Sequence, residues 1–110
     1  MAQQVTDQTN HEPVLEVISS MTADSLEATK LDTESLMLVR LAALVAVDAP
    51  AASYMLNLGV AAEVGVDVEQ VQSVLTAVAP IVGAPRVVAA VGRMAEGLGI
   101  AIDLGQIPAQ

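Results

Sequence analysis

The sequence predicts an all-α protein of about five to six helices, and two observations lead to this prediction. Apolar residues recur in most segments at the 3.6-residue spacing of one helix face rather than at the alternating spacing of a strand. Pro, Gly and Asp residues fall between these segments, where helices begin and end. A length of 110 residues, 54% of them apolar, fits one domain. We expect this domain to span residues 11–104, between a polar N-terminal tail at 1–10 and a C-terminal tail at 105–110.

The N-terminal part of this domain predicts two short helical pieces. Pro13 suits the first turn of a helix at 12–21, because its missing N–H has no partner in that turn. A second short piece, capped by Thr22 or Asp24, is expected to end at Ala28.

A longer helix is predicted over residues 33–47, with Asp32 or Thr33 as its N-cap. This segment is apolar on every side apart from Arg40. A helix that is apolar all round is buried all round, and a monomer of 110 residues has little room to bury one. We therefore expect a neighbouring subunit to cover part of this helix, so the sequence predicts a homo-oligomer.

The next helix is predicted at 50–64, because Pro50 suits a helix start and Gly65 suits a left-handed C-terminal cap. Asp67 and Gln70 then have the spacing of a capping box, in which each side chain bonds the backbone N–H of the other residue. This box predicts the start of a further helix.

That further helix is expected at 68–79, stopped by Pro80 and Gly83. Its predicted inward stripe consists of Val71, Val74, Leu75 and Val78. A last long helix is predicted at 85–98, and the segment 99–110 is expected to form either a short extra helix or an arm on a neighbour.

Composition excludes several classes of function. The 13 acidic residues outnumber the 4 basic ones and set a net charge of −9, so nucleic acid backbones would repel the chain. No apolar run reaches the ~18 residues of a membrane span, and the N-terminus lacks the pattern of a signal peptide, so we expect a cytoplasmic protein with no membrane contact. No Cys is present and His11 is the only histidine, so we expect no metal site and no cofactor.

Three segments, taken in order and spacing, carry a family resemblance. They are LDTESLMLVRLAALVA at 31–46, AAEVGVDVEQV at 61–71 and APIVGAPR at 79–86. Together they resemble the carboxymuconolactone decarboxylase-like proteins, which include the alkylhydroperoxidase D-like thiol peroxidases. The resemblance covers roughly residues 31–98. It implies a compact all-α fold that assembles into rings, commonly trimers or hexamers, through the central helices.

The resemblance also implies where the reactive residues of the thiol peroxidases would fall. The Glu position falls on Met37, the two Cys positions on Pro50 and Ser53, and the His position on Asn57. Thiol peroxidase chemistry needs a thiolate and a resolving thiol, so the absence of Cys excludes it. The decarboxylase branch needs no Cys, but it needs a general acid or base and a cation for the substrate carboxylate.

Six residues near the matching site remain as candidates. Asp48 and Tyr54 are candidates for catalysis, and Arg40, Ser53, Tyr54, Asn57 and Arg86 are candidates for ligand binding. Arg40 forms either a structural ion pair with Asp48, Glu63 or a neighbouring subunit, or a clamp for an anionic ligand. Asp48 and Pro50 are expected to cap a helix start, and Arg86 is expected to be either solvent-facing or paired or to contact a ligand.

Residues 50, 53, 54 and 57 share one helical face. This face either lines a remnant pocket or hydrogen-bonds to a loop or a neighbouring subunit. Two functions therefore stay open. The first is a non-catalytic assembly or small-ligand-binding protein, and the second is a cysteine-independent, decarboxylase-type enzyme acting on a small lactone or carboxylate.

Overall fold

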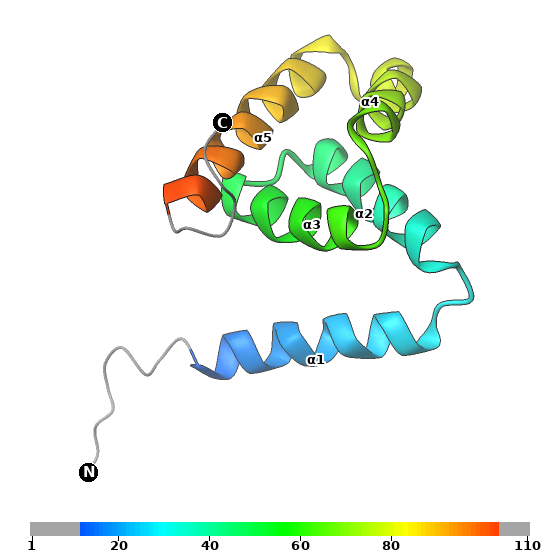
Figure 1. The fold of residues 1–110 in the computed structure, drawn as a ribbon, viewed down its shortest axis with the longest axis vertical. Helices are drawn as coiled ribbons and strands as arrows, with labels where there is room; N and C mark the ends of the chain where they lie inside the picture. The colour runs from blue at the N-terminus through cyan, green and yellow to red at the C-terminus, as the bar shows by residue number, and fades with distance from the viewer. Residues whose placement is uncertain (1–11, 104–110) are drawn as a thin grey trace. The chain divides into compact units, whose positions relative to one another are not determined.

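The computed structural model describes residues 12–103, with side chains described for 12–99, and every regular element in that range is an α-helix (Figure 1). The all-α prediction is therefore confirmed for these residues. The predicted tails at 1–10 and 105–110 lie outside them. The chain divides into two compact units, one ending at Leu31 and one beginning at Asp32.

The first unit contains one helix, α1 (Glu12–Ala28), with Pro13 in its first turn as expected. The prediction of two pieces is wrong, because Thr22 does not cap a new helix. Its hydroxyl donates instead to the carbonyl of Ile18, one turn earlier in the same helix, at 3.0 Å. All of the α1 residues are exposed to solvent.

The second unit begins with α2 (Thr33–Val47), and its N-cap is Asp32, one of the two predicted residues. The Asp32 carboxylate accepts from the Ser35 backbone N–H at 2.8 Å and from the Ser35 hydroxyl at 3.1 Å. These bonds lower the pKa of Asp32 below its ordinary value. One side of α2 is buried, but Val39 and Val47 are exposed. A single chain therefore does not bury this helix on every side.

The next helix, α3 (Ala51–Glu63), has Pro50 as its N-cap and ends in a Schellman motif. The N–H of Val66 donates to the carbonyl of Ala61 at 2.9 Å, and the N–H of Gly65 to that of Ala62 at 3.2 Å. Gly65 has a φ of 98°, a conformation that glycine adopts without the steric cost of a Cβ. The predicted left-handed cap at this residue is confirmed.

The fourth helix, α4 (Val68–Val82), begins at the predicted capping box and runs past the predicted stop at Pro80. The N–H of Gln70 donates to the Asp67 carboxylate at 2.8 Å, and the N–H of Asp67 to the Gln70 side chain at 3.0 Å. Pro80 lies in the last turn, where its missing N–H removes one helical hydrogen bond. The helix ends at Gly83, whose N–H donates to the carbonyl of Ala79 at 2.9 Å.

The last helix, α5 (Ala84–Asp103), is longer than predicted, because it continues through residues 99–103. It packs against α3 at Gly97, which is buried. A Cβ on Gly97 would lie 2.9 Å from the backbone oxygen of Ala51 and 3.2 Å from the backbone nitrogen of Met55. The two helices therefore approach closely only because this position has no side chain.

The core lies between α2, α3, α4 and α5. Its buried residues are Leu41, Val45, Ala49, Tyr54 and Ala90. The predicted α4 stripe, residues 71, 74, 75 and 78, packs against them, which confirms that prediction. A second cluster consists of Met37, Ala61 and Val66. No helix within residues 12–103 combines the length and the apolar character needed to cross a membrane.

Candidate functional site

The predicted polar face lies in the first half of α3. Pro50 precedes the helix and is exposed, whereas Ser53 and Asn57 are half-buried. The Asn57 side-chain amide donates to the carbonyl of Ser53 at 2.8 Å. This bond lies within a single helix, so it holds the Asn57 side chain against its own backbone.

Tyr54, on the same face, points into the core and is 1% exposed. Its hydroxyl has no hydrogen-bond partner among the described residues. Burial raises the pKa of Tyr54 above its ordinary value, the Asp48 carboxylate raises it further, and Arg93 lowers it in part. The phenol is therefore neutral at pH 7, and its ring contributes to packing.

Asp48 caps the C-terminus of α2, rather than the helix start where the sequence placed it. Its backbone is left-handed, with φ 56° and ψ 54°, a conformation that Asp tolerates better than most residues do. The N–H of Asp48 donates to the carbonyl of Val45 at 3.2 Å, and the N–H of Ala49 to that of Leu44 at 3.0 Å. Helix α2 therefore ends at Val47, and Asp48 turns the chain towards α3.

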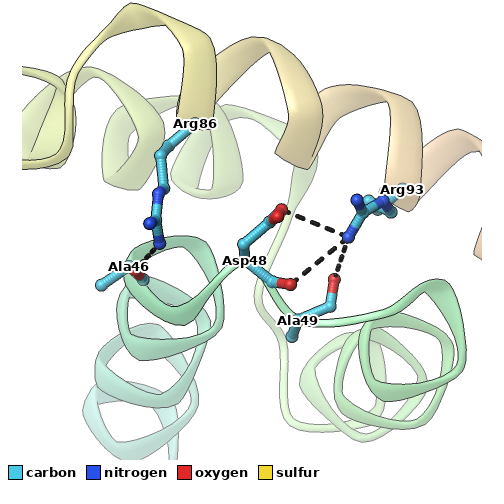
Figure 2. A network of polar contacts seen from close by, with 5 residues as sticks. All are labelled: Ala46, Asp48, Ala49, Arg86 and Arg93. Atoms are coloured by element: carbon cyan, nitrogen blue, oxygen red, sulfur yellow. Dashed lines mark hydrogen bonds and ion pairs between the residues drawn. The ribbon is translucent and has the colours of Figure 1, made fainter.

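Two arginines of α5 reach this end of α2 (Figure 2). The Arg93 guanidinium lies 3.2 Å from the Asp48 carboxylate and donates to the carbonyls of Ala49 at 2.9 Å and Asp48 at 3.3 Å. The Arg86 guanidinium donates to the carbonyl of Ala46. We call these five residues the arginine cap.

The arginine cap has a clear electrostatic role. Helix α2 has no basic residue in its last turn, although the carbonyls at a helix C-terminus carry partial negative charge. The guanidinium groups of Arg86 and Arg93 supply the missing positive charge from another helix. One nitrogen of each guanidinium, Nη1, is thereby bound to protein atoms.

The sequence prediction missed Arg93 as the partner of Asp48. The two residues lie 45 positions apart in the sequence. The sequence holds an indirect signal for such a partner, because α2 has no basic residue in its last turn. Arg40, the cation expected to pair with Asp48, Glu63 or a neighbour, is half-buried near the middle of α2.

A groove opens on another part of the same unit, with a volume of about 840 Å³. It is lined mainly by aliphatic side chains of α3, the start of α4 and the end of α5. Its charged lining residues are Glu63 and Asp67, both acidic. None of the six predicted site residues lines this groove.

Between residues 12 and 103, no group of three or more His, Asp or Glu side chains is placed to hold a metal ion. Tyr54 and the arginine cap lie close together, but the arginines are bound to Asp48 and to backbone carbonyls. Comparisons with protein-family models, with curated proteins and with solved structures found no match to this chain.

Proposed function

We propose that this chain is a non-catalytic assembly protein, a cysteine-free relative of the carboxymuconolactone decarboxylase-like proteins that forms a homo-oligomer such as a trimer or a hexamer. The observation that carries the proposal is the apolar surface of a single chain. Within residues 12–99, sixteen large apolar side chains are exposed, whereas ten apolar residues are buried. Exposed apolar side chains that gather on one element mark an interaction site, and six of the sixteen lie on α1.

The strongest support comes from α1, which has six of these exposed side chains. They are Val14, Leu15, Val17, Ile18, Met21 and Leu26, each 49–64% exposed. Full burial of such a side chain from water contributes about 1.5–3 kcal/mol. Burial of the exposed half of all six would therefore contribute about 5–9 kcal/mol, which offsets much of the cost of association.

The arginine cap supports the non-catalytic half of the proposal. One nitrogen of each guanidinium, at residues 86 and 93, already binds the end of α2, so both arginines have a structural role that needs no ligand. The alternative, an enzyme acting on a small lactone or carboxylate, has less support from this geometry. Incubation with such compounds tests it, since their consumption would favour the enzyme.

Ligand binding is a second candidate, favoured by the groove. A volume of about 840 Å³ falls in the range of small-molecule sites. The acidic side chains of Glu63 and Asp67 would repel a carboxylate, so a neutral lactone suits this groove better. A thermal-shift panel that pairs each lactone with its open-chain carboxylate tests this candidate. A rise in melting temperature with lactones alone is the expected result.

Sedimentation equilibrium at micromolar concentration tests the assembly. We expect a mass corresponding to three or more chains. A mass of one chain across the whole concentration range would overturn the proposal, whatever the result of the ligand panel.

A further inference from the structure

Helix α1 has the form of a ridge that is suited to a groove. Val14, Val17, Ile18 and Met21 lie at positions i, i+3, i+4 and i+7, so they form one stripe along the helix. Each is between 53% and 64% exposed. Amphipathic helices that bind in apolar grooves present anchors at this spacing. The 17 residues of α1 give it a length of about 25 Å.

The groove on the second unit is a suitable receptor for such a ridge. Its exposed aliphatic side chains come from three helices: Leu56 and Val60 of α3, Val68 of α4 and Leu98 of α5. They are between 47% and 72% exposed. Their contact with an aliphatic helix would remove apolar area from water on both partners.

We propose that the groove is the docking site for α1 of a second copy of this chain. Two grooves are both concave and cannot fill each other, whereas a helix ridge is convex and aliphatic like the groove lining. Each copy has this ridge and this groove among its described residues, so head-to-tail contacts can close into a ring in which every such ridge is covered. This inference rests on the proposed assembly and names its contact surfaces.

Most of the charges on α1 are compatible with this occupant. Glu16 and Glu27 lie on the side of α1 opposite to the stripe, so they stay in water when the stripe is covered, whereas Asp24 follows Met21 by three residues and lies at the edge of the stripe. The groove acids, Glu63 and Asp67, are exposed. Helix α1 has no Lys or Arg, which disfavours an anionic lipid surface as its partner.

The absence of Cys allows a direct test, because each introduced thiol is unique. Chains with Ile18→Cys are mixed with chains with Val60→Cys and treated with a short bismaleimide. A cross-link between the two variants is expected, since Ile18 lies in the stripe and Val60 in the groove. Val88→Cys is the matched control, because Val88 is an exposed aliphatic residue of α5 outside the groove. It should give no cross-link to Ile18→Cys.

A pair of charge variants tests the same contact by affinity. Ile18→Asp places a carboxylate in the stripe and should weaken self-association about 100-fold. Ser20→Asp adds the same charge on the opposite side of α1 and should change it less than about 3-fold. Equal effects of the two variants would overturn the proposed docking.

The outcomes separate this inference from the proposed function. A wild-type chain that stays monomeric would overturn both. An oligomer in which the mixed variants fail to cross-link, and in which Ile18→Asp associates normally, would overturn only the docking of α1 in the groove. A third sample is a chain that carries both Ile18→Cys and Val60→Cys. If its cross-link forms only within one chain, α1 lies in the groove of its own chain, and the proposed docking between copies is overturned.

Discussion

The close approach of α3 and α5 makes Gly97→Ala the sharpest test of the packing. The new Cβ would lie 2.9 Å from the backbone oxygen of Ala51 and 3.2 Å from the backbone nitrogen of Met55. Both are backbone atoms, so the helices must separate for the methyl group to fit. Such overpacking costs about 1–3 kcal/mol. Ala is also better than Gly in a helix by about 0.8–1 kcal/mol, which offsets part of that cost.

Gly92→Ala is the matched control for this substitution. Gly92 lies in the same helix, and a Cβ there would meet no atom within 4 Å. This variant should be more stable than the wild type by about 0.8–1 kcal/mol. The helix-propensity gain cancels between the two variants, so the difference in their free energies of unfolding equals the packing cost.

Urea unfolding followed by circular dichroism, at one protein concentration for all variants, measures this difference. We expect Gly97→Ala to be less stable than Gly92→Ala by about 1–3 kcal/mol. Equal stability of the two variants would refute the close α3–α5 contact.

Substitutions at three polar residues test further contacts. Tyr54→Phe should leave stability at pH 7 unchanged or raise it by about 1 kcal/mol, because it removes an unpartnered buried hydroxyl. It should also remove the stability loss of the wild type above about pH 10, where the unfolded Tyr ionises before the folded one. Arg93→Ala should lower the free energy of unfolding by about 1–2 kcal/mol. Arg93→Lys should lower it less, because lysine keeps the positive charge although it lacks the guanidinium group. Asp67→Ala should lower the free energy of unfolding by about 1 kcal/mol, because it removes the carboxylate that accepts from the Gln70 N–H in the capping box.

Each of these substitutions has a readout and a contrary outcome. The phenolate absorbance reports Tyr54 alone, since the chain has one Tyr and no Trp, and a midpoint at or below the ordinary pKa would contradict its burial. Equal urea midpoints for Arg93→Ala and the wild type would show that the arginine cap adds nothing. For Asp67, the Asp67→Asn variant is the control, because Asn keeps the capping acceptor and should retain most of the stability.

Features encoded by neighbouring residues could be predicted from the sequence. The caps at Asp32 and Asp67 and the left-handed turn at Gly65 depend on side chains within a few positions, and all three are confirmed. The inward stripe of α4 follows from its spacing in the same way. The predicted end of α4 at residue 79 is wrong, because a Pro in a last turn removes only one hydrogen bond, whereas the predicted stop at Gly83 is confirmed.

The candidate site depended on contacts that join distant segments, and these have no local signal. The bonds from Arg93 to Asp48 and Ala49 span 44 and 45 residues. A pattern of small and apolar residues does not reveal that Gly97 meets the backbone of α3, nor that Tyr54 is buried in the core. The shared face of residues 50, 53, 54 and 57 was predicted from helical spacing, but what each side chain binds required the structure.

The central claim is that the chain functions as an assembly of several copies. The dependence of its melting temperature on protein concentration tests this claim most directly. When an oligomer unfolds to separate chains, its stability depends on protein concentration by mass action. We expect the melting temperature of the wild type to fall on roughly 100-fold dilution, and to fall reversibly. A melting temperature that stays the same at every concentration would contradict the claim, because it would describe a chain that folds and unfolds alone.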